Sequence, residues 1–449
     1  MIKARIHFPA GFLWGTATSS HQVEGSQPDN DWSLWEQEEG RILHGHRAGL
    51  ACDWWSGRWQ EDLDRAAADG HNAHRLSLSW SRIEPEQGQW DENALHIYRN
   101  IIAGVRARGL TPMVTLHHFT NPRWVMDAGG WHNPEICKWF EAFTRKVVDR
   151  IGDLVSLWVT INEPNVYAFG AYLEGIFPPG EKNIRALPEV TEHLLRGHVA
   201  AYHAIHERYP QARVGLAHHY RSFRPMRRNS FLDASIASMK ARFFNNLFPD
   251  AVADGVLSLF SRKAIPEAAG TQDFFGLNYY TRELSRFDLL HPASMLSLGE
   301  FAADAEVSPT GFIANEPAGM WEALAWAHRY RLPIYVTENG IEDDGDDLRR
   351  RYLARHIHQV WKAANMCWQV RGYFYWTLVD NFEWERGWTQ RFGLYALDTR
   401  TQERTPRPSA RFYTEICTAN GLSSDVLREY APGALEAIFP ERGPDDLSG

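Results

Sequence analysis

Two short segments place a glutamate directly after a run that is typical of a buried β-strand. The first is VTINEP at 159–164, which contains Glu163, and the second is IYVTENG at 334–340, which contains Glu338. Two carboxyl groups that flank one bond can cleave a glycosidic linkage, because one donates a proton to the leaving oxygen while the other stays ionised. These roles require surroundings that push the two pKa values apart. Arg75 could hold one carboxylate ionised, and that anion would raise the proton affinity of the other.

Polar and aromatic side chains stand at the ends of the other strand-like runs as well. Imidazoles, amides, hydroxyls and indoles suit a neutral, hydroxyl-rich ligand, since sugars present C–H faces that stack on Trp. The chain contains 19 Trp among 449 residues, and 13% of its residues are aromatic. The side chains at these ends include Gln22, Arg75, His118, Asn162, His219, Asn278, Tyr280, Asn339 and Trp376.

The elements that must position these residues alternate along the whole chain. Apolar strand-like runs occur eight times, at 11–17, 73–80, 110–118, 155–162, 212–219, 273–280, 332–340 and 371–378. Helical patterns lie between them; the segment 91–109, for example, carries apolar residues on one face and ends at Gly109. Repeated strand–helix–strand units call for parallel pairing with right-handed crossovers. Eight units in one chain predict a (β/α)₈ TIM barrel.

No linker or change of composition divides the sequence, so we expect one domain over 1–449. The stretches 163–212 and 281–332 would be helix-bearing excursions from the barrel rim. A doubly wound open sheet is the competing architecture, but the first strand is not followed by the GxGxxG spacing that this fold usually brings. In a barrel the active face lies at the C-terminal ends of the strands, where Glu163 and Glu338 would face each other from the fourth and seventh strands.

Composition and charge exclude several classes of partner. The chain has 47 Lys and Arg against 56 Asp and Glu, a formal net charge of −9 without long runs of one sign, which disfavours nucleic acid. No stretch approaches the roughly 20 apolar residues that a membrane span requires, and no signal-peptide core follows the start. Four widely spaced cysteines without a CxxC motif favour reduced thiols and a cytoplasmic protein. No sequence pattern indicates the oligomeric state.

Two of these segments, WVTINEP (158–164) and YVTENG (335–340), resemble the two catalytic signatures of glycoside hydrolase family 1, the β-glucosidase type. Further motifs agree with the family in the same order along the chain. They are FLWGTATSSHQVEG (12–25), HRLSLSWSRIEP (74–85), LHHF (116–119), GLNYYTR (276–282) and YWTLVDNFEWERGWTQRFGLYALD (375–398). The set spans essentially the whole chain, and the fold that it implies is the same eightfold barrel.

The resemblance implies a role for each matching residue. Glu163 would be the acid/base, Glu338 the nucleophile, and Arg75 and Tyr280 the hydrogen-bond donors that keep the nucleophile anionic. The sugar hydroxyls and ring would be held by Gln22, His118, Asn162, Trp376, Glu383 and Trp384, with Asn278 in the same network. The implied reaction is double displacement with retention, without a cofactor or metal, and with the carboxyls roughly 5 Å apart. The expected substrates are β-glucosides and short oligosaccharides such as cellobiose, with β-fucosides and β-galactosides as side activities.

Relatives with other activities differ at positions where this chain keeps the glucosidase residues. Members that act on 6-phosphorylated sugars lack the Glu383–Trp384 pair, and an anion at Glu383 would repel phosphate. Thioglucosidases carry Gln in place of the acid Glu163. Non-catalytic carbohydrate-binding relatives lose one of the two glutamates, and here both Glu163 and Glu338 are present.

The paired histidines 117–118 and 218–219 also raise the alternative of a metal-dependent barrel hydrolase, in which histidines would bind the metal. Adjacent residues on a strand point to opposite faces, so each pair supplies at most one inward ligand. An acidic third ligand is not evident, and loss of activity in EDTA would favour this alternative.

Three departures from the family pattern affect the outer part of the site. Asn165 stands where a Trp commonly follows the NEP triplet, the usual HWDLP reads HFTNP at 118–122, and His21 replaces a common Tyr. We therefore expect Asn165 to make the aglycone site more polar. That polarity would let hydroxylated acceptors, including glucose, bind outside the inner site, which favours transglycosylation and tolerance of product.

Overall fold

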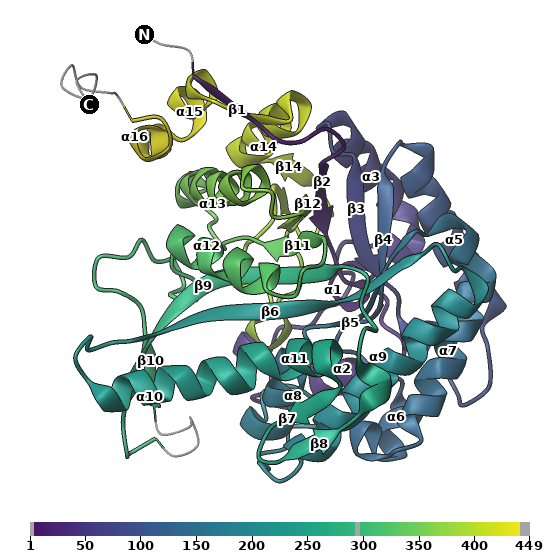
Figure 1. Ribbon diagram of the computed structural model, residues 1–449. Coiled ribbons are helices and arrows are strands. Elements are labelled where there is room, and N and C mark those ends of the chain that lie inside the picture. Colours follow the sequence, from purple (N-terminus) through teal and green to yellow (C-terminus); the bar gives the residue numbers. More distant parts are fainter. Residues whose placement is uncertain (1–3, 292–296, 441–449) are drawn as a thin grey trace.

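Eight parallel strands close into a barrel that helices surround in the computed structural model, which describes residues 4–291 and 297–440 (Figure 1). The barrel strands are β2 (Leu13–Ala17), β3 (Ala73–Ser77), β4 (Thr111–His117), β5 (Leu157–Asn162), β6 (Arg213–Pro225), β9 (Phe275–Phe287), β11 (Ile334–Asn339) and β12 (Val370–Trp376). They pair in the order β9-β11-β12-β2-β3-β4-β5-β6, and the parallel pairing of β6 with β9 closes the barrel. The predicted (β/α)₈ barrel is confirmed, and each of the eight predicted runs overlaps one of its strands.

The barrel strands are covered on both faces, which explains why they read as nearly continuous apolar runs. Every residue of β3, β5 and β11 is buried. Gly276 allows β9 and β6 to approach each other closely, because a Cβ at this position would lie 2.5 Å from the carbonyl oxygen of Leu216. The polar residues at the strand ends are therefore carried by a rigid, closely packed frame.

The predicted helix over 91–109 is present as α5 (Glu92–Ala107). The side chain of Asp91 accepts hydrogen bonds from the backbone N–H groups of Asn93 and Ala94, which caps the start of the helix. Its apolar face is buried in the core, and Gly109 follows the helix in a left-handed conformation with φ of 75°. The other long outer helices are α3 (Trp59–Ala68), α7 (Ile136–Ile151), α9 (Leu187–Arg208), α12 (Pro317–His328), α13 (Asp347–Asn365) and α14 (Pro408–Ala419).

Two barrel strands run further than the sequence predicts. β6 and β9 have 13 residues each and continue together out of the barrel, where α10 (Phe231–Lys240) packs along both (Figure 1). The hairpin partner of β9 is β10 (Ser297–Glu300), so the excursion over 281–332 contains strand as well as the expected helix. The added length carries β6 and β9 beyond the C-terminal ends of the other barrel strands.

Short elements fill the connections between the barrel units. The helical ones include α1 (Ser20–Val23), α2 (Asp31–Trp35), α4 (Trp80–Ile83), α6 (Arg123–Asp127), α8 (Pro164–Phe169), η5 (Gly170–Glu174), η6 (Ala241–Asn246), α11 (Leu247–Asp254), α15 (Ser424–Tyr430) and α16 (Leu435–Ile438). Two-stranded sheets pair β1 (Arg5–His7) with β15 (Gly421–Ser423), β7 (Val256–Ser258) with β8 (Arg262–Ala264), and β13 (Tyr395–Leu397) with β14 (Arg404–Pro406). None of the helices in the described parts of the chain has the length and apolar character of a membrane span.

Candidate active site

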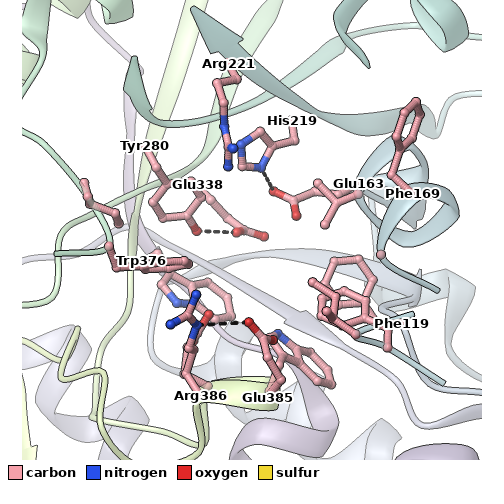
Figure 2. A pocket seen from close by; sticks show the side chains of 18 of the residues that line it. Phe119, Glu163, Phe169, His219, Arg221, Tyr280, Glu338, Trp376, Glu385 and Arg386 are labelled. Atoms are coloured by element: carbon pink, nitrogen blue, oxygen red, sulfur yellow. Dashed lines mark hydrogen bonds and ion pairs between the residues drawn. The ribbon is translucent and has the colours of Figure 1, made fainter. Parts of the chain in front are cut away.

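Glu163 and Glu338 reach one cavity from two different barrel strands (Figure 2). Glu163 follows β5 directly, and Glu338 is the penultimate residue of β11. The cavity has a volume of about 320 Å³, within the usual range of ligand pockets. Its inner wall is formed by His118, Glu163, Tyr280, Glu338, Trp376, Glu383 and Trp384. The structure thus brings the two predicted glutamates to the same hollow at the C-terminal face of the barrel.

The backbone at Glu163 explains how this side chain is directed. Glu163 has φ of 44° and ψ of 59°, a left-handed conformation that non-glycine residues rarely adopt. Its N–H donates to the carbonyl oxygen of Ala217 in β6 at 2.8 Å, and Pro164 begins α8 immediately after it. The sharp turn between strand and helix sends the Glu163 side chain into the cavity. Strain of this kind is retained where surrounding contacts fix it, as it is here.

Two donors hold the carboxyl group of Glu338. Arg75 on β3 donates from Nη1 to Oε1 at 2.6 Å, and the hydroxyl of Tyr280 on β9 donates to Oε2 at 2.6 Å. Arg75 is 1% exposed, and its Nη2 donates to Oδ1 of Asn162 at 2.6 Å. Arg75 and Tyr280 therefore occupy the positions that the family resemblance implied for them.

A separate pair of donors holds Glu163, and both act on the same oxygen. His219 Nδ1 lies 2.8 Å from Glu163 Oε1, and Asn278 Nδ2 donates to the same oxygen at 2.8 Å. Asn278 also donates to Asn162 Oδ1 at 3.2 Å, so Asn162 and Arg75 connect the environments of the two glutamates. Asn278 contacts the predicted acid/base directly and reaches the predicted nucleophile only through this network.

The surroundings give the two carboxyl groups unequal proton affinity. Burial raises the pKa of Glu338 to about 7, a shift that Arg75 opposes and Glu163 reinforces. Burial acts on Glu163 too, but His219, Asn278 and Arg75 outweigh it and leave its pKa below the ordinary value. The sequence led us to expect that Arg75 would make Glu338 the more acidic group, but burial has the larger effect. Because the two groups interact, they titrate as a pair.

The wall opposite the glutamates is aromatic and contains a neutral imidazole. Burial lowers the pKa of His118 well below its usual value, with smaller contributions from Arg75 and His117. Its Nε2 accepts from Asn162 Nδ2 at 3.1 Å, which places the ring proton on Nδ1. That Nδ1 is buried and has no hydrogen-bond partner in the described residues, so it can donate to a ligand hydroxyl. The ring is stacked between Trp376 and Trp384, with centroid distances of 6.0 and 5.9 Å.

Gln22 contacts Glu383, which lines the cavity, but Gln22 itself is fully buried and is not part of the cavity wall. Gln22 donates from Nε2 to Glu383 Oε2 at 3.2 Å and to the carbonyl oxygen of Phe382 at 2.8 Å. Burial raises the pKa of Glu383 well above its usual value, and the charges of Glu385, Glu338 and Glu163 raise it further. The raised pKa favours the protonated form of Glu383, whereas the sequence suggested an anion, and a protonated carboxyl group can both donate to and accept from sugar hydroxyls.

Asn165 does not lie where the sequence predicts it. Its side chain is buried, and Nδ2 donates to the backbone carbonyl oxygens of His219 and Phe244, both at 2.9 Å. The cavity wall contains the next residue, Val166, but not Asn165. The prediction that Asn165 makes the aglycone site polar is therefore wrong: the turn at Glu163 directs Asn165 toward β6 and η6.

Several residues that form the outer half of the cavity had no role predicted from the sequence. His219 was noted at a strand end without a role, and its contact with Glu163 could not be read from the chain. The mouth contains the charged residues Glu174, Arg221, Glu385 and Arg386 (Figure 2). Its apolar side is lined by Phe119, Val166, Phe169, Ile176, Phe177, Phe244 and Phe312. Most of these residues lie in rim segments whose conformation depends on contacts distant in sequence.

The histidine pairs divide between the cavity and the surrounding core, as strand periodicity predicts. His118 and His219 line the cavity, whereas His117 contacts Asn121 at 3.1 Å and His218 contacts Gln272 at 3.1 Å. Within residues 4–291 and 297–440, no three His, Cys, Asp or Glu side chains are grouped so that they could hold a metal ion.

Comparison with known proteins identifies relatives over nearly the whole chain. The profile of the family described as Glycosyl hydrolase family 1 matches residues 4–422. Beta-glucosidase A of Thermotoga maritima is 33% identical, with the match covering 92% of this chain and 98% of the relative. The structure of a beta-glycosidase from Pyrococcus horikoshii aligns with a TM-score of 0.88 and 36% identity over 95% of this chain and 98% of that one. A beta-glucosidase from Thermotoga maritima solved in complex with glucoimidazole aligns with a TM-score of 0.87 and 32% identity, covering 93% and 100% of the two chains.

Proposed function

The chain belongs to glycosyl hydrolase family 1, and from this membership and the geometry of the cavity we propose that it is a retaining β-glucosidase that acts by double displacement. One observation carries the proposal. Glu163 and Glu338 enter one cavity from separate strands, and each carboxyl group has its own set of donors. A binding site for sugar alone does not require two such differently held carboxyl groups.

In the first half of the reaction, Glu338 attacks the anomeric carbon while Glu163 protonates the leaving oxygen. The reactive form has Glu338 ionised and Glu163 protonated, which the protein side chains alone make the less populated arrangement of the shared proton. The positive charge that develops at the sugar carbon favours the ionised Glu338 beside it. Arg75 stabilises this carboxylate through Oε1 and Tyr280 through Oε2.

In the second half, Glu163 becomes the base. Once Glu338 forms the glycosyl ester it no longer carries a charge, so the pKa of Glu163 falls further. Glu163 then takes a proton from water, and the hydroxide so generated attacks the anomeric carbon from the side on which the aglycone left. Two inversions at one carbon give a product with the same anomeric configuration as the substrate.

The inner cavity is suited to an uncharged glucose ring. Trp376 offers an apolar face for the ring, and His118 Nδ1 and the protonated Glu383 offer hydrogen bonds to its hydroxyl groups, with Gln22 holding Glu383 from behind. Because neutral Glu383 can both donate and accept, it tolerates either orientation of a 4-hydroxyl, and β-galactosides and β-fucosides are expected as slower substrates. The phosphate of a 6-phosphorylated sugar finds no cation next to Glu383, since Arg386 is paired with Glu385.

The outer half of the cavity can accept a second sugar. Asn165 is buried away from the cavity, so the polar groups of the outer half are those of Glu174, Arg221, Glu385 and Arg386. Phe244 and Phe312 provide surfaces on which a sugar can stack. A sugar held there after the first half-reaction would compete with water for the glycosyl ester. We therefore expect cellobiose and short oligosaccharides as substrates and transglycosylation at high glucose concentration.

A panel of nitrophenyl β-glycosides, with the anomer of the first product followed by NMR, tests this function. The β-glucoside should give the highest kcat/KM, and β-glucose should appear before mutarotation yields the α-anomer. Initial release of α-glucose would exclude double displacement. A higher kcat/KM for the β-galactoside than for the β-glucoside would reassign the inner site.

A further inference from the structure

The contact between His219 and Glu163 has no role in the reaction as described so far. His219 Nδ1 and Asn278 Nδ2 both bond to Oε1 of Glu163, and the described residues place no hydrogen bond on Oε2. An oxygen that accepts two N–H donors is a poor place for a proton, because the proton would displace one of the donors. The proton of the neutral acid is then left to Oε2, the oxygen that is free to meet a ligand.

The imidazole ring of His219 is itself held in place. It stacks on Tyr280 with a centroid distance of 5.7 Å and an interplanar angle of 25°, and Phe244 packs edge-on at 5.6 Å. Asn165 fixes the backbone on both sides of this contact by donating to the carbonyl oxygens of His219 and Phe244. The orientation of Nδ1 is therefore determined by three elements: β6, β9 and η6.

On the premise that Glu163 is the acid/base of the proposed function, we propose that His219 is a positioning residue. Its Nδ1–H and the side-chain amide of Asn278 both donate to Oε1 of Glu163. The proton of the acid is therefore carried by Oε2, from which it is transferred to the leaving oxygen. Asn165 supports this arrangement by fixing the strand from which His219 projects. Asn165 and His219 thus form a connected chain from α8 through β6 back to Glu163. Figure 2 shows its last contact, between His219 and Glu163.

Two substitutions of similar shape separate the hydrogen bond from the packing. His219→Asn keeps a donor close to the position of Nδ1, whereas His219→Leu keeps the branched shape and removes the donor. His218→Gln is the control, because His218 lies on the same strand and faces the core side, where it contacts Gln272. All variants are compared by kcat/KM on 2,4-dinitrophenyl and phenyl β-glucosides. The first substrate has a leaving group that departs without a proton, and the second has one that needs it.

We expect His219→Leu to lower kcat/KM for the phenyl glucoside about tenfold relative to the dinitrophenyl glucoside, equivalent to about 1.4 kcal/mol. His219→Asn should restore most of this loss, and His218→Gln should leave the ratio of the two substrates unchanged. Because the comparison is made within one protein sample, partial unfolding lowers both values equally and does not alter the ratio.

The pH profile provides a second measurement. The groups that face His219 are Glu163, the residue that precedes α8, Tyr280 from β9 and Arg221, two residues further along β6. A donor to Oε1 stabilises ionised Glu163, so its removal in His219→Leu should raise the pKa of Glu163. Because Glu163 is the more acidic group of the pair, the acidic limb of kcat/KM for the phenyl glucoside should move to higher pH. His219→Asn should leave the limb close to its original position.

Equal losses on both glucosides with an unmoved acidic limb, or a His219→Asn variant as impaired as His219→Leu, would overturn the proposal for His219. Glu163→Gln separates this failure from failure of its premise. If Glu163→Gln shows the selective loss on the phenyl glucoside and His219→Leu does not, only the positioning role is refuted. If Glu163→Gln shows no selective loss, the acid/base assignment fails and the proposal for His219 fails with it.

Discussion

Replacement of Arg75 by Met tests whether a buried cation keeps the nucleophile reactive. Arg75→Met removes the Nη1 contact with Glu338 Oε1 and the Nη2 contact with Asn162, both 2.6 Å, and leaves an apolar side chain of similar length. Tyr280 remains as the single side-chain donor to Glu338 among the described residues. The pKa of Glu338, which burial already raises to about 7 in the presence of Arg75, should rise further.

The size of the effect follows from the charge that is lost. At an effective dielectric constant near 20, two unit charges about 4 Å apart attract each other by about 4 kcal/mol. At about 1.4 kcal/mol per pKa unit this attraction is worth up to about 3 units, and repacking around the Met side chain would reduce it to about 2. Below the pKa the ionised fraction falls tenfold per unit, so kcat/KM at pH 6 should fall about 10²- to 10³-fold.

The assay is the pH dependence of kcat/KM for p-nitrophenyl β-glucoside between pH 5 and 9. Because Glu338 has the higher pKa of the pair, its titration gives the basic limb, which should move to higher pH by 2 to 3 units. Arg75→Lys should fall between the two proteins, because an ammonium group keeps the charge but cannot match the forked contacts to Glu338 and Asn162. A basic limb that stays in place in Arg75→Met, or a variant that retains more than a tenth of the activity at pH 6, would refute the role of Arg75.

The same substitution has a defined consequence for stability. The pKa of Glu338 is raised on folding, so the folded protein holds this proton more tightly than the unfolded chain does. The stabilisation that Glu338 contributes by protonation is present at low pH and is lost as pH rises through about 7. Arg75→Met should therefore be destabilised less at pH 5 than at pH 8, because the uncompensated carboxyl group is neutral at the lower pH. Denaturant unfolding at the two pH values measures this difference.

Four further outcomes are expected. Tyr280→Phe removes a donor to Glu338, so kcat/KM should fall about 10- to 100-fold, the range for a hydrogen bond to a charged group, and the basic limb should move to higher pH; an unchanged profile would contradict this. Glu383→Gln resembles the neutral acid and should raise KM for glucosides less than tenfold, whereas Glu383→Ala should raise it more; equal effects would show that Glu383 binds as an anion. Arg404→Leu removes the fully buried cation of Asp62 and leaves it paired with the partly exposed Arg65, so the free energy of unfolding should drop by about 3 kcal/mol while kcat/KM of the folded protein is retained. Dialysis against EDTA should leave activity unchanged, and its loss would favour a metal-dependent reaction.

The barrel could be predicted because its strands carry two strong signals. Strands buried on both faces read as apolar runs, and helices between them imply parallel pairing, so eight repeats leave few alternatives. The position of Glu163 and Glu338 at strand ends follows from the same pattern, since the strands of a barrel all end at one face. The sequence predicted that one histidine of each pair, 117–118 and 218–219, points inward, because adjacent residues of a strand face opposite sides. This rule does not say which of the two it is, so His118 and His219 could not be singled out.

The orientation of Asn165 and the protonation of the site could not be predicted. Asn165 follows a left-handed residue, and one unusual φ value at Glu163 turns the helix that begins there. The extension of β6 and β9 beyond the barrel depends on their pairing with each other and on packing against α10. The length of either strand therefore cannot be predicted from its own residues. The order of pKa values at Glu338 and Glu163 depends on how deeply each carboxyl group is buried and on the contact with His219, which is known only once the chain is folded.

Labelling with 2,4-dinitrophenyl 2-deoxy-2-fluoro-β-glucoside tests most directly whether Glu338 attacks the sugar. The fluorine slows both half-reactions and the dinitrophenolate leaves easily, so the glycosyl ester accumulates and can be located by peptide mass spectrometry. We predict a stoichiometric fluoroglucosyl adduct on the peptide that contains Glu338, and no adduct in Glu338→Gln. An adduct on Glu163 or another residue, or turnover of β-glucosides by Glu338→Gln at the wild-type rate, would contradict the account.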